Sequence, residues 1–112
     1  MDKITKYQQE IEAFLQEEAN LPISNVGLER QIIADHKRSH YQLLVCGWEG
    51  SKYVYSIQIH LDIKPNGKIW IQQNWTELQI TDELMARGVA KDDIVIGFIP
   101  EYERSYTGFA VS

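Results

Sequence analysis

The first segment of the chain has the hydrophobic spacing of an amphipathic helix. Charged and amide side chains separate apolar residues that recur mostly every three or four positions, namely Ile4, Tyr7, Ile11, Phe14 and Leu15. Asp2 can accept hydrogen bonds from the first free backbone N–H groups, and Pro22 disfavours helix in the residue before it. We therefore predict a helix over about residues 2–19.

Between Leu28 and Phe98 most apolar residues follow a period of two, which is typical of strands. Short polar turns separate the runs, so consecutive strands should be antiparallel. The predicted strands are Glu29–Ala34, Tyr41–Trp48, Tyr53–Ile63 and Lys68–Gln73. In the third strand, alternation predicts one face made of Tyr53, Tyr55, Ile57, Ile59, Leu61 and Ile63, and an opposite face made of Val54, Ser56, Gln58, His60 and Asp62.

Helical spacing returns after Trp75, in the apolar series Leu78, Ile80, Leu84 and Met85. Thr76 or Thr81 can cap the start of this helix, and Gly88 can end it. The next apolar segment, residues 93–98, fits either a short buried strand or a turn of helix. Aromatic residues in the tail from Pro100 to Ser112 suggest that the tail docks onto the body of the protein.

Together these elements predict one α+β domain over residues 1–112. An N-terminal helix and a C-terminal helix would pack on a mainly antiparallel meander sheet of four to five strands. The apolar stripe of the first helix would cover the apolar face of the sheet, and the other face would meet water or a partner.

Composition narrows the class of function. The formal net charge of −5 argues against direct DNA binding, because proteins that hold the DNA backbone usually present a basic face. The N-terminal residues lack the apolar core of a signal peptide and no apolar run is long enough to span a membrane, so we expect a cytoplasmic protein. The single cysteine, Cys46, cannot form an internal disulfide, and its apolar neighbours predict an inert buried position.

The histidines do not predict a metal site or a catalytic centre. His36 and His40 are four residues apart but belong to a predicted corner between strands, and no acidic or cysteine partner has metal-ligand spacing along the chain. His60 and Asp62 share a strand face, yet no nucleophile motif or phosphate-binding loop accompanies them. We expect no catalytic residue, no metal and no cofactor.

The polar face of the predicted sheet is the best candidate for a binding surface. Trp70 should lie opposite Ile69 and Ile71, among polar neighbours, and a tryptophan in that setting is typical of protein interfaces. The alternative is that the tail or the C-terminal helix covers Trp70. The predicted partner-binding residues are Ser56, Gln58, His60, Trp70 and Gln72. Such a face can also pair with a second copy of the chain.

Several stretches of the sequence closely resemble the XisI family, the fdxN-element excision controlling factors of cyanobacteria. The resemblance covers nearly the whole chain, and its strongest pieces are HYQLLVCGWEG, IHLDIKPNGKIWIQQNWTE and ELMARGVAKDDIVIGF. The N-terminal MDKITKYQQEIEAFL and the closing YTGFAVS are also similar to that family.

This resemblance implies a non-enzymatic accessory protein. Such a protein would bind a XisH-type, nuclease-like partner in the programmed excision of a DNA element by a site-specific recombinase. This excision is an event of heterocyst differentiation. The resemblance supplies no catalytic residues. Two alternatives stay open. One is a direct DNA-binding excision factor, and the other is a small-ligand-binding or enzymatic domain that uses His60, Asp62 and Trp70.

Overall fold

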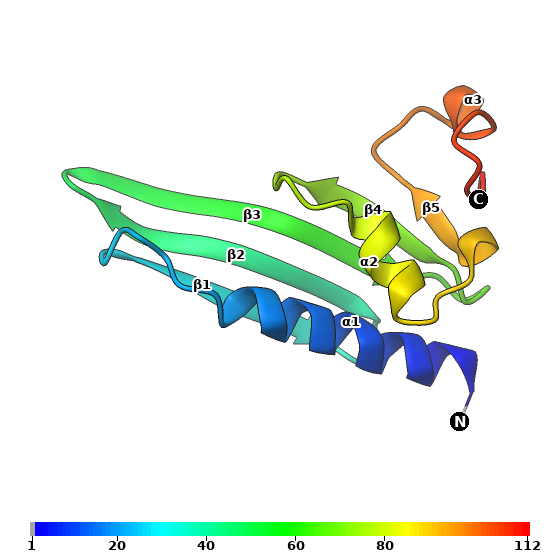
Figure 1. The fold of residues 1–112 in the computed structure, drawn as a ribbon, viewed down its shortest axis with the longest axis horizontal. Helices are drawn as coiled ribbons and strands as arrows, with labels where there is room; N and C mark the ends of the chain where they lie inside the picture. Colours follow the sequence, from blue (N-terminus) through cyan, green and yellow to red (C-terminus); the bar gives the residue numbers. More distant parts are fainter. Residues whose placement is uncertain (1) are drawn as a thin grey trace.

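The computed structural model describes residues 2–112 and contains one five-stranded sheet with helix α1 along one face (Figure 1). The elements are α1 (Lys3–Ala19), β1 (Leu28–Asp35), β2 (His40–Glu49), β3 (Lys52–Ile63), β4 (Ile69–Asn74), α2 (Ile80–Ala86), the 3₁₀ turn η1 (Lys91–Asp93), β5 (Ile94–Ile96) and α3 (Glu101–Arg104). The strands follow one another in sequence order across the sheet, antiparallel from β1 to β4 and parallel between β4 and β5. The predicted α+β class and the mainly antiparallel meander are confirmed.

Helix α1 forms where the hydrophobic spacing predicts it. The Asp2 carboxylate accepts a hydrogen bond of 2.7 Å from the Thr5 backbone N–H and caps the first turn. The buried stripe of the helix is Tyr7, Ile11, Phe14 and Leu15. Burial of one such side chain stabilises the fold by roughly 1.5–3 kcal/mol. This stripe therefore anchors the helix on the sheet.

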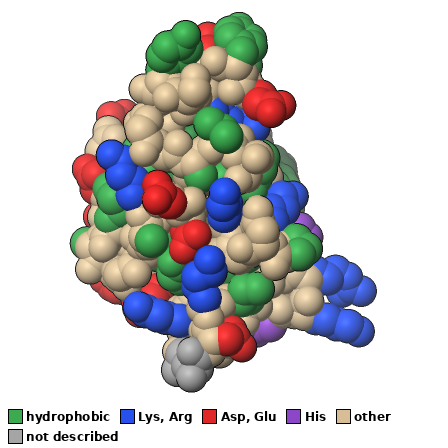
Figure 2. Space-filling model, turned by 90° about the vertical axis from the view of Figure 1, so that its right-hand side faces the viewer, with side chains coloured by type: hydrophobic (Ala, Val, Ile, Leu, Met, Phe, Trp, Pro, Cys, Tyr) green, Lys and Arg blue, Asp and Glu red, His purple; other side chains and the backbone are tan. Residues whose placement is uncertain are grey.

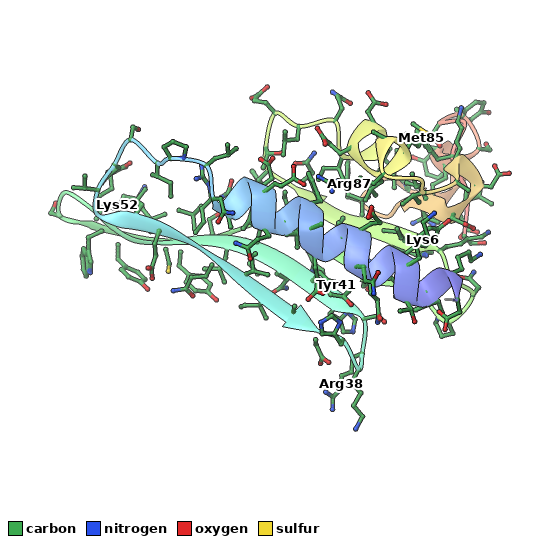
Figure 3. The ribbon with its side chains drawn as sticks, turned by 60° about the horizontal axis from the view of Figure 1, so that its bottom comes forward. Lys6, Arg38, Tyr41, Lys52, Met85 and Arg87 are labelled. Atoms are coloured by element: carbon green, nitrogen blue, oxygen red, sulfur yellow. The ribbon has the colours of Figure 1, made fainter. Side chains whose placement is uncertain are left out.

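The main core lies between α1 and the sheet. Strands β2, β3 and β4 present to the helix the buried residues Tyr41, Leu43, Ile59, Leu61, Ile63, Ile69 and Ile71. Ile80 and Leu84 of α2 and Ile94 of β5 close the same core. Figure 3 shows Tyr41 beneath the axis of α1.

The expectation that one set of alternate residues in β3 faces the core throughout is wrong. Leu43 of β2 pairs with Ile59, but its neighbour Leu44 pairs with Ile57, so Gln58 is an extra residue in β3. Paired residues share a face and adjacent residues of β2 do not. This β-bulge therefore places Ile57 on the face opposite Ile59, and the faces of β3 exchange at Gln58.

Backbone groups at the bulge are held by the end of β4. The Trp75 backbone N–H donates to the carbonyl of Gln58 at 2.8 Å, and the side-chain amide of Gln73 donates to the carbonyl of Ile57. These bonds give hydrogen-bond partners to the two consecutive carbonyls at the bulge. The position of the bulge thus depends on a strand that follows it in the sequence.

Helix α2 begins between the starts that its two threonines predicted. Its N-cap is Gln79, whose side chain makes no capping hydrogen bond, so neither predicted threonine cap is correct. Thr76 forms a turn instead, because its backbone N–H donates to the Asn74 side-chain oxygen at 2.9 Å. Gly88 does follow the end of the helix, with φ of 93°, a conformation that glycine adopts without steric cost.

The C-terminal tail docks beside β5, as predicted. The Arg104 guanidinium donates to the carbonyls of Ile99 at 3.0 Å and Val111 at 3.2 Å. The Ala110 N–H donates to the Ile94 carbonyl at 2.9 Å. The segment at 93–98 contains β5, so the strand alternative is correct, and the 3₁₀ turn η1 immediately precedes it. Within residues 2–112, no helix is both long and apolar enough to cross a membrane.

Candidate functional site

The face of the sheet opposite α1, here the open face, carries the candidate site. The β2–β3 hairpin extends beyond the C-terminal end of α1, and Lys52 marks its tip (Figures 1 and 3). The open face has two parts. The aromatic end, near this tip, contains Trp48, Tyr53 and Tyr55, whereas the polar end, toward β4 and β5, contains His40, His60, Asp62, Trp70 and Gln72.

The aromatic end exposes three large rings. Trp48 pairs with Tyr53 and their ring centroids lie 5.2 Å apart, while Tyr55 pairs with Cys46 one step along the hairpin. The exposed fractions are 56% for Trp48, 54% for Tyr53 and 61% for Tyr55. Ile33 of β1 adds a fourth exposed apolar side chain to the open face. Aromatic rings held on a sheet with little cover are typical of protein-binding surfaces.

Sequence reasoning missed this surface. The alternation of Tyr53 and Tyr55 continues that of Ile59 and Leu61 without interruption, so both tyrosines were assigned to the core. The bulge at Gln58 reverses their direction, and no glycine or proline in β3 signals it. The register between β2 and β3 is what identifies the aromatic end.

At the polar end, the carboxylate of Asp62 is buried and has several partners. Asp62 as a whole is only 4% exposed. His40 Nδ1 lies 3.6 Å from Oδ2, Lys64 Nζ lies 3.5 Å from the same oxygen, and Gln72 donates its amide N–H to Oδ1 at 3.2 Å. His40 and Lys64 are both about half exposed, so each can leave the carboxylate without unfolding the sheet.

His60 lies two residues before Asp62 on β3 and shares the open face with it. Its Nδ1 contacts the Gln42 side-chain amide at 3.3 Å, and its buried Nε2 has no hydrogen-bond partner among residues 2–112. Burial lowers the pKa of the His60 imidazole; the negative charge of Asp62 opposes this shift, and the nearby His40 and Lys64 add to the lowering. Burial therefore favours the neutral form of the ring.

Trp70 is partly covered, as the alternative interpretation of its position predicts. The Arg104 guanidinium lies 4.9 Å from its ring centroid and Lys64 Nζ lies 5.5 Å away. A cation over an indole face is attracted by the ring quadrupole. The cover comes from the docked tail, which brings Arg104 over β4.

The five predicted partner-binding residues do not form one surface. His60, Trp70 and Gln72 lie together on the open face. Ser56 pairs with Val45 on the opposite face, and Gln58, the bulged residue, donates its amide to Ser56 Oγ at 2.9 Å. The bulge again accounts for the difference, because it separates residues that regular alternation would keep together.

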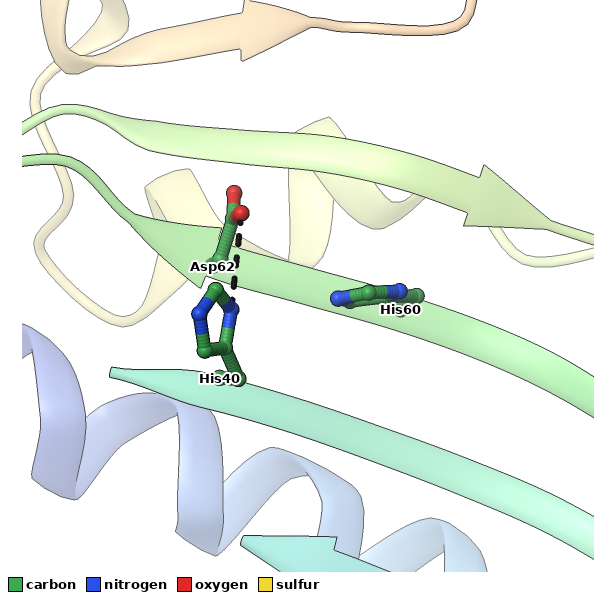
Figure 4. A group of neighbouring side chains, drawn as sticks. All are labelled: His40, His60 and Asp62. Atoms are coloured by element: carbon green, nitrogen blue, oxygen red, sulfur yellow. Dashed lines mark ion pairs between the residues drawn. The ribbon is translucent and has the colours of Figure 1, made fainter. Parts of the chain in front are cut away.

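Sequence reasoning also did not foresee a possible metal-ligating group. Potential ligand atoms of His40, His60 and Asp62 all lie within 4.8 Å of one another (Figure 4). His40 is far from His60 along the chain, but it pairs directly with Asp62 across β2 and β3. Spacing within one segment could not reveal this group, since strand pairing creates it.

Cys46 lies at the aromatic end of the open face and is partly buried. Its thiol lies 3.8 Å from the Glu29 carboxylate, to which it donates. Burial raises the pKa of the thiol and the negative charge of Glu29 raises it further. Both effects disfavour the thiolate that reactive cysteines require.

A family model described as XisI protein matches residues 1–111. The chain belongs to the XisI family. A crystal structure of a XisI-like protein from Anabaena variabilis ATCC 29413 shares 40% sequence identity with it, with a TM-score of 0.90, and the alignment covers 97% of this chain and 99% of the relative.

A second XisI relative, the fdxN element excision controlling factor XisI from the same organism, is 37% identical. Its TM-score is 0.84, and the alignment covers 99% of this chain and all of the relative. A search of curated proteins gave no match. The XisI fold is therefore shared over nearly the full length of the chain.

Proposed function

We propose that this XisI-family chain is a non-enzymatic accessory protein that binds a XisH-type, nuclease-like partner in the programmed excision of a DNA element. The relative named as an excision controlling factor supports the biological setting. The observation that carries the binding role is the aromatic end of the open face, with its exposed Trp48, Tyr53 and Tyr55.

The aromatic end has the properties of a binding surface. Trp and Tyr are enriched among the residues that dominate interface energies, because each buries a large rigid area and retains one polar group. Paired strands β2 and β3 fix the backbone that carries the rings, so no chain segment has to become ordered when a partner covers them. We propose that the partner covers Trp48, Tyr53 and Tyr55 and reaches toward His60, Trp70 and Gln72.

The charge distribution favours a protein partner over DNA. The net charge is −5, and at the end of the molecule that carries both termini acidic side chains lie among the basic ones (Figures 1 and 2). A surface that tracks phosphates would gather Lys and Arg on one face. In the proposed complex, contact with the DNA element and with the recombinase is made by the partner.

Co-expression with a XisH-type protein from the same genome tests the proposal. We expect the two proteins to co-purify, and light scattering to give the mass of a hetero-complex. If the purified chain is recovered only as a monomer or as a homo-oligomer, the proposed partner is wrong. A mobility shift of element-end DNA by the isolated chain, weakening steeply with salt, would instead support the DNA-binding alternative.

Paired substitutions test the surface. The double variant Trp48→Ala/Tyr55→Ala should weaken association by about 1,000-fold, since two aromatic anchors contribute about 2 kcal/mol each and every 1.4 kcal/mol is about tenfold in affinity. Tyr102→Ala is the matched control, because Tyr102 is an exposed aromatic residue of α3 and does not belong to the aromatic end. Equal loss in both variants, or no loss in either, would assign binding to another surface.

A further inference from the structure

Three side chains at the polar end of the open face converge from two strands. His60 and Asp62 are two residues apart on β3 and share a face, and His40 of β2 pairs directly with Asp62. Figure 4 shows the two imidazoles and the carboxylate as neighbours on β2 and β3, with the ion pair between His40 and Asp62. Their potential ligand atoms lie within 4.8 Å of one another.

Two imidazoles and one carboxylate suit a first-row divalent transition metal. Imidazole nitrogen is a preferred ligand of Zn²⁺, whereas Ca²⁺ and Mg²⁺ prefer sites made of oxygen atoms. Tetrahedral coordination with bonds of 2.0–2.1 Å separates ligand atoms by about 3.3 Å. The observed spacing of up to 4.8 Å can contract to that value by side-chain rotation, because His40 is half exposed.

Neighbouring amides already orient two of the three ligands. Gln42 contacts His60 Nδ1 at 3.3 Å, which leaves Nε2 as the ligand atom, and this buried nitrogen has no hydrogen-bond partner among the described residues. Gln72 donates to Asp62 Oδ1 at 3.2 Å, which leaves Oδ2 for a cation. Side-chain partners of this kind set the ring orientation of metal-ligating histidines and position ligating carboxylates.

The Lys64 ammonium occupies the place beside Asp62 that a metal ion would take. Its Nζ lies 3.5 Å from Asp62 Oδ2, the oxygen that also faces His40. A buried carboxylate requires a positive partner, and a metal ion bound to Oδ2 would replace the ammonium. Lys64 is about half exposed and can turn into solvent when a metal binds.

We propose that His40, His60 and Asp62 form a binding site for one Zn²⁺-like divalent transition-metal ion on the open face. Three protein ligands leave at least one coordination position for water or for a group of a bound molecule. Because β2 and β3 each contribute ligands, the bound metal would cross-link the two strands. The metal site is independent of the proposed partner, since its test uses the isolated chain.

Isothermal titration of the full chain with Zn²⁺, without an affinity tag, tests the site. We expect saturable binding of one ion per chain and an increase in Tm, because the unfolded chain does not hold the three ligands together. Co²⁺ should bind at the same stoichiometry and give the visible absorption of a low-symmetry site. Absence of saturable binding in the wild-type chain would overturn the proposal.

Substitutions locate the ion. His60→Gln or His40→Gln should weaken Zn²⁺ binding by more than 100-fold, exceeding the roughly 10–100-fold loss expected when an orienting partner is removed, as in Gln42→Leu. Lys64→Met should instead bind Zn²⁺ several-fold more tightly, because the competing cation is gone. That gain does not follow from a merely structural role of the carboxylate.

His36→Gln is the matched control. His36 pairs with Glu12 of α1 at 2.8 Å and is not part of the proposed site, so its loss should leave affinity and stoichiometry unchanged. Circular dichroism confirms that each variant is folded before titration. The proposal fails if His36→Gln reduces binding as much as His60→Gln, or if the triple variant H40Q/H60Q/D62N binds Zn²⁺ as tightly as the wild type.

Discussion

The two ends of the open face share strands β2 and β3, yet they differ in what covers them. At the polar end, Trp70 lies under Arg104 of the docked tail and Asp62 is buried among its partners. At the aromatic end, Trp48 and Tyr55 remain more than half exposed. The polar end is thus completed by the chain itself, whereas the aromatic end presents the area that a partner can cover.

One residue, Gln58, decides which side chains of β3 reach the aromatic end. On the C-terminal side of Gln58 the alternate residues Ile59 and Leu61 face α1, and on its N-terminal side Tyr53 and Tyr55 face away from it. A single inserted residue exchanges the two faces of every position beyond it. An apparently uniform hydrophobic strand therefore supplies both a core and an exposed surface.

Deletion of Gln58 should reduce the stability of the protein more than any other change considered. Without the extra residue, the register of β3 forces either the tyrosines toward the helix layer or Ile59 and Leu61 out of the core. We expect the free energy of unfolding to fall by more than about 4 kcal/mol, or folding to fail. Urea unfolding monitored by tryptophan fluorescence measures the change.

The control Gln58→Ala keeps the residue count and loses the hydrogen bond to Ser56, at a cost of about 1 kcal/mol. A deletion variant as stable as Gln58→Ala would show that the bulge does not separate the two halves of β3.

Alanine substitutions on the two sides of the bulge should differ strongly in how much stability they cost. Ile59 is completely buried, so Ile59→Ala should cost about 2–5 kcal/mol through lost contacts and a residual cavity. Tyr55→Ala, at an exposed position, should change stability by about 1 kcal/mol or less. Comparable losses in urea unfolding would mean that the tyrosine contributes to the core.

Alkaline pH should destabilise the core through Tyr41. Burial raises the pKa of this phenol to about 12, and the carboxylates of Glu12 and Asp35 contribute to the shift. Because the folded-state pKa lies above the unfolded value near 10, the stabilisation is complete below pH 10 and is lost as pH rises toward 12. The slope should approach about 1.4 kcal/mol per pH unit for this one group.

Unfolding measured across that range in Tyr41→Phe should show a shallower pH dependence than in the wild type. Tyr55→Phe, on the exposed side of the bulge, is the control variant. If the curves of Tyr41→Phe and the wild type stay parallel from pH 10 to 12, another group causes the alkaline loss.

The smallest expected effect on stability comes from Arg104, which covers Trp70 at the polar end. Arg104→Gln removes the cation over Trp70 and weakens the bonds that hold the tail, at a cost of about 1 kcal/mol. In a Trp48→Phe/Trp75→Phe background, Trp70 is the remaining tryptophan, and acrylamide should quench its fluorescence more efficiently after Arg104→Gln. Unchanged quenching would indicate that other groups shield the ring.

Much of the fold follows from local chemistry. The spacing of Tyr7, Ile11 and Phe14, with Asp2 as cap, predicts α1 because periodicity and capping act within a few residues. The turns between strands are predicted for the same reason, and short turns imply antiparallel neighbours. Hydrophobic and polar patterning alone is therefore sufficient for the helix-on-sheet architecture.

The candidate sites required tertiary structure. Sequence reasoning singled out His60, Trp70 and Gln72, which do share the open face, but it placed Ser56 and Gln58 with them. Alternation assumes an uninterrupted ladder, and no residue type in β3 marks the position of the bulge. The two consecutive carbonyls at the bulge are bonded by groups of β4 and the residue after it, so that position depends on contacts formed late in the sequence.

By itself, the sequence determined the α+β class, the helix that covers the sheet and the membership of the XisI family. Only the tertiary structure decided that Tyr53 and Tyr55 are exposed and that His40 lies beside His60 and Asp62. Local patterns determine which elements form, because hydrophobic periodicity and hydrogen bonding act over short distances along the chain. The sites depend on strand register, which is set by the packing of residues that are distant in sequence.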